Sequence, residues 1–301
     1  MQNFFRQVDH YPALRRNQAM LESLTTATAR QGAAAERTFP QRIPVVVHVL
    51  YNDAADNISD DQIASQIEVL NEDYSGKNSD LKKVPEPFKE LVSNPGLEFF
   101  LAEVDPAGAA TDGITRQQTS VHAFSIDDSM KADTSGGKSP WDTTRYLNIW
   151  VCRLSSSVLG YAQFPGGPPE TDGVVILTSA FGRGGTAVDP FNLGRTATHE
   201  VGHYFNLSHI WGEARVPTCT DSDFVDDTPN QFGPNSKKPK FPSSSCGNTP
   251  HGDMFMNYMD YVDDDTMFMF TRQQVERIHA TLEFSRSKLG TMAGGSSMIA
   301  T

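Results

Sequence analysis

Three histidines and one glutamate lie within the short stretch from His199 to His209. On an α-helix, residues four apart lie about 40° apart around the axis, so His199 and His203 project from one face, one turn apart. Imidazole nitrogens are common ligands of zinc. Glu200 follows the first histidine directly, where its carboxylate can reach a metal-bound water as a general base. The spacing therefore predicts a zinc centre that activates water.

The third histidine requires a break in the helix. If the helix continued, His209 would lie roughly 240° around the axis from His203 and would point away from the metal. Asn206 is the expected pivot, because asparagine readily adopts the left-handed conformation that ends many helices. With the helix ended there, His209 completes a three-histidine site with one position open for water.

Two motifs in the sequence carry a family resemblance. The stretch from His199 to His209 resembles the extended zinc motif of the metzincin metallopeptidases, with Asn206 where most of that clan has glycine. The downstream segment Asn257-Tyr258-Met259-Asp260-Tyr261 is similar to the methionine-containing turn that lies beneath the metal in that clan. Together they resemble most closely the pappalysin (cytophagalysin) family, including its ulilysin-like microbial members, over residues 40–290.

This resemblance implies a fold class and a domain organisation. The fold is expected to be α+β, a metzincin-type zincin with a mixed twisted sheet and the zinc helix in the upper subdomain. The lower subdomain is expected to be rich in loops and to end in a helix. The catalytic domain would span residues 40–290, with the upper part ending near 205 and the lower part starting near 206. Residues 291–301, which are rich in glycine and serine, are expected to form a flexible tail.

Residues 1–39 form a polar N-terminal extension that ends before Pro40. Two interpretations are open: a prosegment that covers the active-site cleft until it is cleaved, or a disordered or helical extension without that role. The extension contains no cysteine, so no thiolate from it can bind the zinc.

The resemblance also assigns roles in the methionine turn. Met259 would form an apolar floor beneath the imidazoles without bonding to zinc, and the phenol of Tyr261 would stabilise the oxyanion as a catalytic residue. A plain core role for Met259 stays open, because other methionines crowd the same segment. They are Met254, Met256, Met267 and Met269.

An acidic block, Asp263-Asp264-Asp265, follows Tyr261. One interpretation is a solvated acidic loop. The other is that one carboxylate, for which we choose Asp264, lines the pocket just past the scissile bond. Such a pocket would bind a basic side chain, with arginine preferred over lysine because arginine pairs with a carboxylate through two hydrogen bonds.

A second acidic group lies between Asp221 and Thr228. Oxygen ligands at this density suit calcium, although the segment does not have the pattern of an EF-hand loop. The family resemblance suggests Asp223, Asp226 and Thr228 as calcium ligands, and a solvated loop is the alternative.

The three cysteines permit one disulfide bond and one remaining thiol. Cys219 and Cys246 bracket a loop without helical or strand periodicity, which a cross-link would stabilise by roughly 3 kcal/mol, and the resemblance implies a bridge here. Three reduced thiols in a cytosolic protein are the alternative. Cys152 lies in an apolar run and is expected in the core.

Composition excludes some functions. The chain has 301 residues, a net charge of −12 and a pI near 5.0, which argues against a nucleic-acid partner because phosphate contacts need clustered Lys and Arg. We expect no membrane span. The first residues lack the basic flank and apolar run of a secretory signal, so secretion, which we expect, would use a signal removed from this chain or another export route.

Hydrophobic patterning predicts the elements that hold these residues. An apolar run predicts a buried strand at 43–51, and the spacing of apolar residues predicts a helix that begins near Asp60. The final helix should begin after Thr271 as N-cap. Its apolar stripe is Val275, Ile278, Leu282 and Leu289. Further strands are expected at 97–104, 146–152 and 173–177, and the zinc helix from about residue 192.

The leading hypothesis is a secreted zinc endopeptidase, made as a proenzyme, that acts on protein or peptide substrates with Glu200 as general base and acid. One rival is a gluzincin, in which Glu276 would replace His209 as third ligand. The other rival is a catalytically silent module that contains zinc and calcium and binds protein partners. An intact Glu200 argues against the silent module, since a structural zinc site needs no base. The sequence leaves the oligomeric state open.

Overall fold

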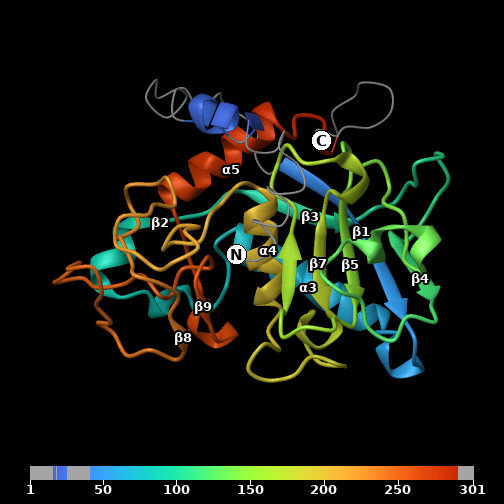
Figure 1. Ribbon diagram of the computed structural model, residues 1–301, viewed down its shortest axis with the longest axis horizontal. Coiled ribbons are helices and arrows are strands. Elements are labelled where there is room, and N and C mark those ends of the chain that lie inside the picture. The colour runs from blue at the N-terminus through green and yellow to red at the C-terminus, as the bar shows by residue number, and fades with distance from the viewer. Residues whose placement is uncertain (1–15, 18, 26–40, 291–301) are drawn as a thin grey trace.

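The computed structural model describes residues 16–17, 19–25 and 41–290, and its centre is a six-stranded sheet (Figure 1). The strands are β1 (Gln41–Tyr51), β3 (Leu97–Leu101), β4 (Ile114–Gln118), β5 (Leu147–Cys152), β6 (Gly160–Ala162) and β7 (Val174–Leu177). Their order is β3-β1-β5-β7-β6, and β4 pairs with the second half of β1. All pairs are parallel except β6 with β7, so the sheet is mixed.

The central strands are buried runs of apolar residues. Both β1 and β5 are buried almost throughout, as expected for parallel strands covered on both faces. Three of the predicted strands are confirmed within a few residues, and β3 ends at Leu101 rather than at residue 104. Strands β4 and β6 were not predicted, because the residues of β4 are mostly polar and β6 has only three residues.

Two helices pack together beside this sheet. Helix α3 (Asp60–Tyr74) begins at Ser59, whose side chain accepts a hydrogen bond from the Gln62 backbone. Helix α4 (Arg195–Tyr204) packs against α3, β6 and β7. It begins three residues later than predicted. Figure 1 shows α4 at the middle of the molecule, with the sheet on one side and the orange loops of the C-terminal half on the other.

The C-terminal half consists mostly of loops. Small sheets join β8 (Ser236–Lys237) to β9 (Tyr261–Val262) and β2 (Val92–Ser93) to β10 (Phe270–Thr271). Helix α5 (Arg272–Phe284) has Thr271 as its N-cap, and Thr271 forms a capping box with Gln274. Leu289 was wrongly placed on the stripe of this helix: the helix ends five residues earlier, and Leu289 is buried in the segment that follows. The expected Cys219–Cys246 disulfide is present, and Cys152 is buried with a free thiol.

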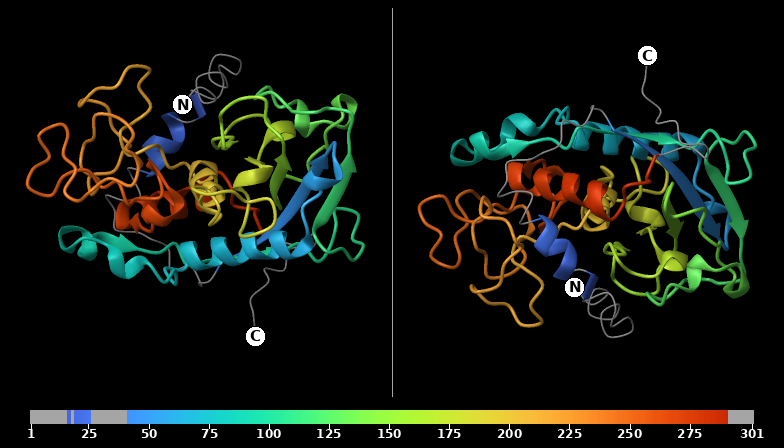
Figure 2. Two further views of the ribbon diagram at one scale, coloured as in Figure 1. Left: turned by 90° about the horizontal axis from the view of Figure 1, so that it is seen from below. Right: turned by 90° about the horizontal axis from the view of Figure 1, so that it is seen from above.

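Short 3-10 helices fill several connections within the described residues. They are Ala54–Asp56, Leu81–Lys83, Glu86–Leu91, Ser129–Lys131, Asp133–Ser135, Pro169–Thr171, Thr178–Ala180 and Asp264–Thr266. The helical residues 19–25 lie beside α5, as the two views in Figure 2 show. The predicted tail at 291–301 and most of the N-terminal extension lie outside the described residues.

Candidate metal centre

The N-terminal end of α4 is held by a carboxylate from a distant loop. Asp264 Oδ2 accepts hydrogen bonds from the backbone N–H groups of Leu193, at 2.8 Å, and Arg195, at 3.3 Å. The N-cap residue Gly194 has φ +80° and no side chain that could do this. A carboxylate at this end satisfies free N–H groups and interacts favourably with the helix dipole. Asp264 therefore fixes the start of the helix that carries the histidines.

The C-terminal end of α4 confirms the predicted pivot. Asn206 has φ +71°. Its N–H donates to the carbonyl of His203, and the N–H of Leu207 donates to the carbonyl of Gly202, both at 2.9 Å. This pair of bonds is the Schellman motif, which ends a helix and reverses the chain. His209 is thereby directed back toward the helix.

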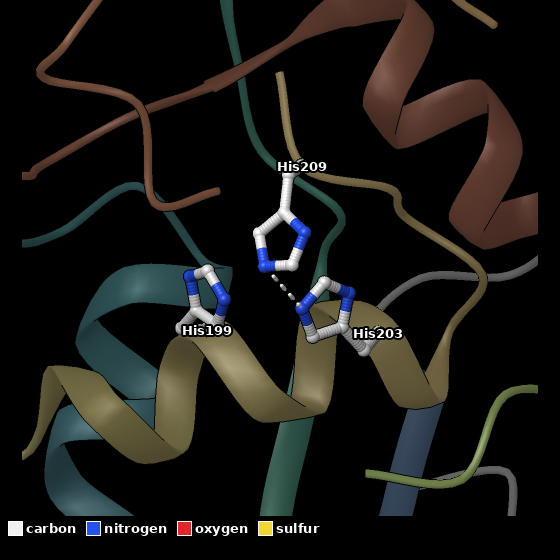
Figure 3. Close-up of side chains that lie close together, drawn as sticks. All are labelled: His199, His203 and His209. Atoms are coloured by element: carbon white, nitrogen blue, oxygen red, sulfur yellow. Dashed lines mark hydrogen bonds between the residues drawn. The ribbon is translucent and has the colours of Figure 1, made fainter. Parts of the chain in front are cut away.

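The three histidines converge (Figure 3). Their potential ligand atoms all lie within 4.8 Å of one another, and the Nε2 atoms of His203 and His209 are 3.2 Å apart. Two nitrogens on one tetrahedral zinc ion lie about 3.3 Å apart, given a Zn–N distance of about 2.0–2.1 Å. Within residues 16–17, 19–25 and 41–290, these histidines form the one group of three or more His, Cys, Asp or Glu residues with ligand atoms this close. The site thus fits a zinc ion.

Burial favours the protonation state that binds metal. It lowers the pKa of His199 to about 4, and it lowers the pKa values of His203 and His209 well below the usual value. Neutral imidazole is the form that ligates a metal. All three rings are therefore ready to bind without first losing a proton at neutral pH.

Two of the three ligand histidines have a hydrogen-bond partner at Nδ1. The Nδ1–H groups of His199 and His203 lie 2.7 Å from the backbone oxygens of Tyr258 and Leu207. The Nδ1 atom of His209 lies 2.8 Å from Glu213 Oε1 without forming a hydrogen bond, and that oxygen accepts a hydrogen bond from the backbone N–H of His209. Such partners fix ring orientation and direct Nε2 to the metal. The sequence could not identify them, and Glu213 supports a ligand rather than acting as one.

Two aromatic rings flank His209. Trp211 stacks on it, with ring centroids 4.5 Å apart and planes 14° apart, a role the sequence analysis missed. Tyr261 meets His209 edge-on at 4.9 Å and lies 5.5 Å from His199. The Tyr261 side chain is 42% exposed, so it borders both the histidines and the solvent.

Met259 lies against the turn of α4 that joins the first two ligands. A Cβ atom built on Gly202 would lie 2.5 Å from Met259 Sδ, closer than packed atoms can approach. Met259 is fully buried. The methionine turn and the zinc helix are therefore in direct contact at a residue without a side chain.

Glu200 lies beside a cavity of about 370 Å³. His199, Gly160 of β6, Tyr261 and Asp264 also line it. Burial raises the pKa of Glu200 to about 8 and that of Asp264 to about 6. The cavity is thus lined by the predicted base Glu200, the predicted oxyanion donor Tyr261 and the predicted specificity residue Asp264.

A buried carboxylate on α3 connects the histidines to the rest of the fold. Asp73 accepts hydrogen bonds of 2.7 Å from the hydroxyls of Thr198 and Tyr258. It also lies 3.5 Å from the Arg195 guanidinium, which pairs with Asp80 through two hydrogen bonds. Nothing in the sequence singled out Asp73, because its partners come from segments far apart in the chain.

The predicted calcium ligands and the alternative zinc ligand Glu276 differ in burial and in their contacts. Asp223 is buried and accepts a 2.6 Å hydrogen bond from Thr228, whereas Asp226 is exposed. Glu276 lies exposed on α5 and is 3.8 Å from Arg272. Since His209 lies with the other two histidines, the gluzincin alternative is wrong.

The comparisons with known proteins agree with this geometry. A family model described as pregnancy-associated plasma protein-A matches residues 131–283. An extracellular metalloprotease of Arthroderma benhamiae is 32% identical over 256 residues, which cover 82% of this chain and 80% of that protein. One from Pyricularia oryzae is 30% identical over 269 residues, covering 86% and 81%.

Solved structures show the same similarity. Mature mirolysin of Tannerella forsythia, in complex with a cleaved peptide, is 49% identical with a TM-score of 0.82 and covers 84% of this chain and 96% of that one. A promirolysin mutant from that organism is 46% identical with a TM-score of 0.83, covering 92% and 93%. Among the described residues, no helix is long and apolar enough to cross a membrane. The chain therefore belongs to the peptidase family of pregnancy-associated plasma protein-A, the pappalysins, and is a metalloendopeptidase with an α+β metzincin fold whose three histidines fit the zinc cofactor of that family.

Proposed function

We propose that the protein is a secreted endopeptidase that hydrolyses peptide bonds of proteins, with zinc held by His199, His203 and His209. The observation that carries this proposal is the convergence of one ligand nitrogen from each histidine, with the buried Glu200 lining the same cavity as His199. Zinc bound there supplies Lewis acidity and lowers the pKa of a bound water to about 7. The relatives named extracellular metalloproteases support secretion.

Glu200 accepts the proton of the attacking water and then donates it to the leaving amine. Burial alone raises the pKa of Glu200 to about 8, and the charge of a zinc ion beside it favours the ionised carboxylate that a base requires. The Tyr261 phenol, on the open side of the histidines, donates a hydrogen bond to the oxyanion. Mirolysin, solved with a cleaved peptide, supports a peptide as substrate.

Asp264 selects arginine or lysine just after the scissile bond. The two backbone hydrogen bonds that Asp264 accepts both end on Oδ2, and Oδ1 is the oxygen we assign to the substrate. Asp264→Asn keeps an oxygen for the helix cap and removes the charge. It should lower the preference for arginine over leucine at least about tenfold, whereas Asp263→Asn, on the neighbouring residue, should retain that preference.

Residues 1–39 act as a prosegment that keeps the enzyme latent until it is cleaved. The match to a promirolysin, which covers more of this chain than the match to mature mirolysin, supports this role. Calcium binds in the loop closed by the disulfide, where Asp223 and Thr228 already lie in contact, and the exposed Asp226 is a further ligand.

Digestion of a denatured protein mixture tests the proposed activity. After release of the N-terminal residues, the protein should cut within chains, and mapping by mass spectrometry should place Arg or Lys after most cut bonds. Removal of zinc with a chelator should stop cleavage, and zinc should restore it. If the zinc-loaded protein cuts no bond, the endopeptidase proposal is wrong.

A further inference from the structure

A second cavity, of about 600 Å³, is lined by Asn206 and Ser208, which follow the C-terminal end of α4, whereas the first is lined by Arg195 and Thr196 at the start of that helix. Phe164, which lines it, packs on His203 with ring centroids 5.1 Å apart. Glu213, which also lines it, supports His209. The cavity is therefore lined by residues that contact His203 and His209, the two ligands that do not line the first cavity. Since the first cavity takes the residue after the scissile bond, this one lies where the residues before that bond would bind.

A buried guanidinium, that of Arg277, lies next to two residues that line this cavity, Glu22 and Asn206. The Arg277 side chain on α5 is only 5% exposed. Its Nη1 donates to Glu22 Oε2 at 2.8 Å, its Nη2 donates to Glu22 Oε1, and Nη2 also donates to the backbone oxygen of Asn206 at 3.0 Å. The Nε atom is buried and has no hydrogen-bond partner. The two-pronged contact with Glu22 is thus the salt bridge that Arg277 forms among the described residues, and the buried Asp223 lies close enough to interact with it electrostatically.

Glu22 belongs to the N-terminal segment rather than to the catalytic domain. Its Oε1 also accepts a 3.2 Å hydrogen bond from Asn206 Nδ2, in the turn between the zinc ligands. The Glu22 side chain is 24% exposed and lines the same cavity. Departure of the segment would leave a buried guanidinium and an amide donor directed at an empty space. A buried charge without its partner is costly, so the vacated site favours another carboxylate.

We propose that Arg277 and Asn206 form a subsite for an acidic side chain of the substrate, N-terminal to the scissile bond, which Glu22 fills while the leading segment is attached. The inference rests on the proposed endopeptidase function. Glutamate fits the site because its carboxylate repeats the two hydrogen bonds to the guanidinium and the one from the amide. The enzyme would then prefer substrates with an acidic residue before the scissile bond and a basic residue after it.

Matched peptides test the subsite. Each peptide carries one arginine after the scissile bond and either glutamate or glutamine at one of the four positions before it. The protein is used after release of its leading residues by limited proteolysis of the full chain. At one position, kcat/KM for the glutamate peptide should exceed that for glutamine roughly ten- to hundredfold, as hydrogen bonds to a charged group predict.

Variants assign that preference to Arg277. Arg277→Gln should bring the ratio of kcat/KM for the glutamate peptide to that for the glutamine peptide near one. Arg277→Lys keeps the charge but cannot form two parallel hydrogen bonds to a carboxylate, and it should retain part of the preference. Arg272→Gln, on the exposed face of the same helix, should keep the wild-type ratio. A wild-type ratio near one at all four positions overturns the inference and needs no variant. Failure to cleave any of the peptides would instead refute the proposed function.

Discussion

The hydroxyl of Tyr258 donates a 2.7 Å hydrogen bond to Asp73, and the carbonyl of Tyr258 lies 2.7 Å from Nδ1 of His199. One residue thereby joins a buried carboxylate on α3 to a zinc ligand on α4. Asp73 also accepts from Thr198, the residue before that ligand. The orientation of the His199 ring thus depends on contacts between α3, α4 and the methionine turn, three segments far apart in the sequence.

Tyr258→Phe should weaken both folding and zinc binding. Loss of the hydroxyl leaves the buried Asp73 with one donor fewer, which costs about 1–3 kcal/mol in free energy of unfolding. Because the Tyr258 carbonyl orients His199, zinc affinity should also fall by roughly tenfold. Urea unfolding and competition with a chelator measure the two effects.

Tyr146→Phe is the matched control for that variant. The Tyr146 hydroxyl donates to the backbone of Val104 at 2.8 Å, away from the histidines. It should lower stability and leave zinc affinity unchanged. Equal zinc affinities for wild type and Tyr258→Phe would refute the link from Asp73 to His199.

The variants Asn206→Gly and Asn206→Val should differ in the amount of zinc that they bind. At φ +71°, glycine meets no steric cost, whereas a β-branched residue is strained by roughly 1–2 kcal/mol or more. We expect the glycine variant to bind one zinc and the valine variant to bind zinc weakly, because its chain no longer turns His209 back. Metal analysis after gel filtration measures both. Full zinc retention in the valine variant would show that the left-handed turn is not required.

The Arg195–Asp80 pair should make stability sensitive to acid. Burial would raise the pKa of Asp80, but the Arg195 guanidinium outweighs burial and holds it below the usual value. The folded state therefore favours ionised Asp80. The stabilisation of the fold by this pair is fully present above the unfolded-state pKa of about 4, and it is lost as the pH falls through the lower pKa of Asp80 in the folded state.

Asp80→Asn removes that contribution. The variant should be less stable than wild type at pH 7 by about 3 kcal/mol, the cost of breaking a buried ion pair. The difference should shrink as the pH falls below about 4. Urea unfolding of the metal-free proteins measures it without interference from zinc loss. A difference that stays constant from pH 7 to pH 3 would mean that Asp80 does not titrate with folding.

The sequence was most informative where chemistry depends on local spacing. The helical offset of His199 and His203 and the turn at Asn206 follow from backbone geometry, so the ligand set could be predicted without a structure. The Nδ1 partners could not, because the carbonyl of Tyr258 meets His199 only after α3 and the methionine turn pack together. Glu213 shows the same limit: nothing in its sequence position assigned it a role, and its carboxylate lies against His209.

The secondary structure, too, could be predicted only where a local sequence pattern determines it. The apolar runs of β1 and β5 were predictable because both faces of these strands are buried. The edge strand β6 was not, because three residues carry no measurable period. Asp264 lies in an acidic block for which both a solvated loop and a pocket residue were open, and only the folded chain shows that it caps the first turn of α4.

The measurement that tests the central claim most directly is peptide cleavage by Glu200→Gln together with its zinc content. The variant keeps the shape of the side chain and removes its basicity. We predict one zinc per chain in both proteins and a fall in kcat of about a thousandfold or more, since general base catalysis contributes about 10²–10⁴-fold. Cleavage at the wild-type rate by a zinc-loaded variant would contradict the assignment of Glu200 as the base.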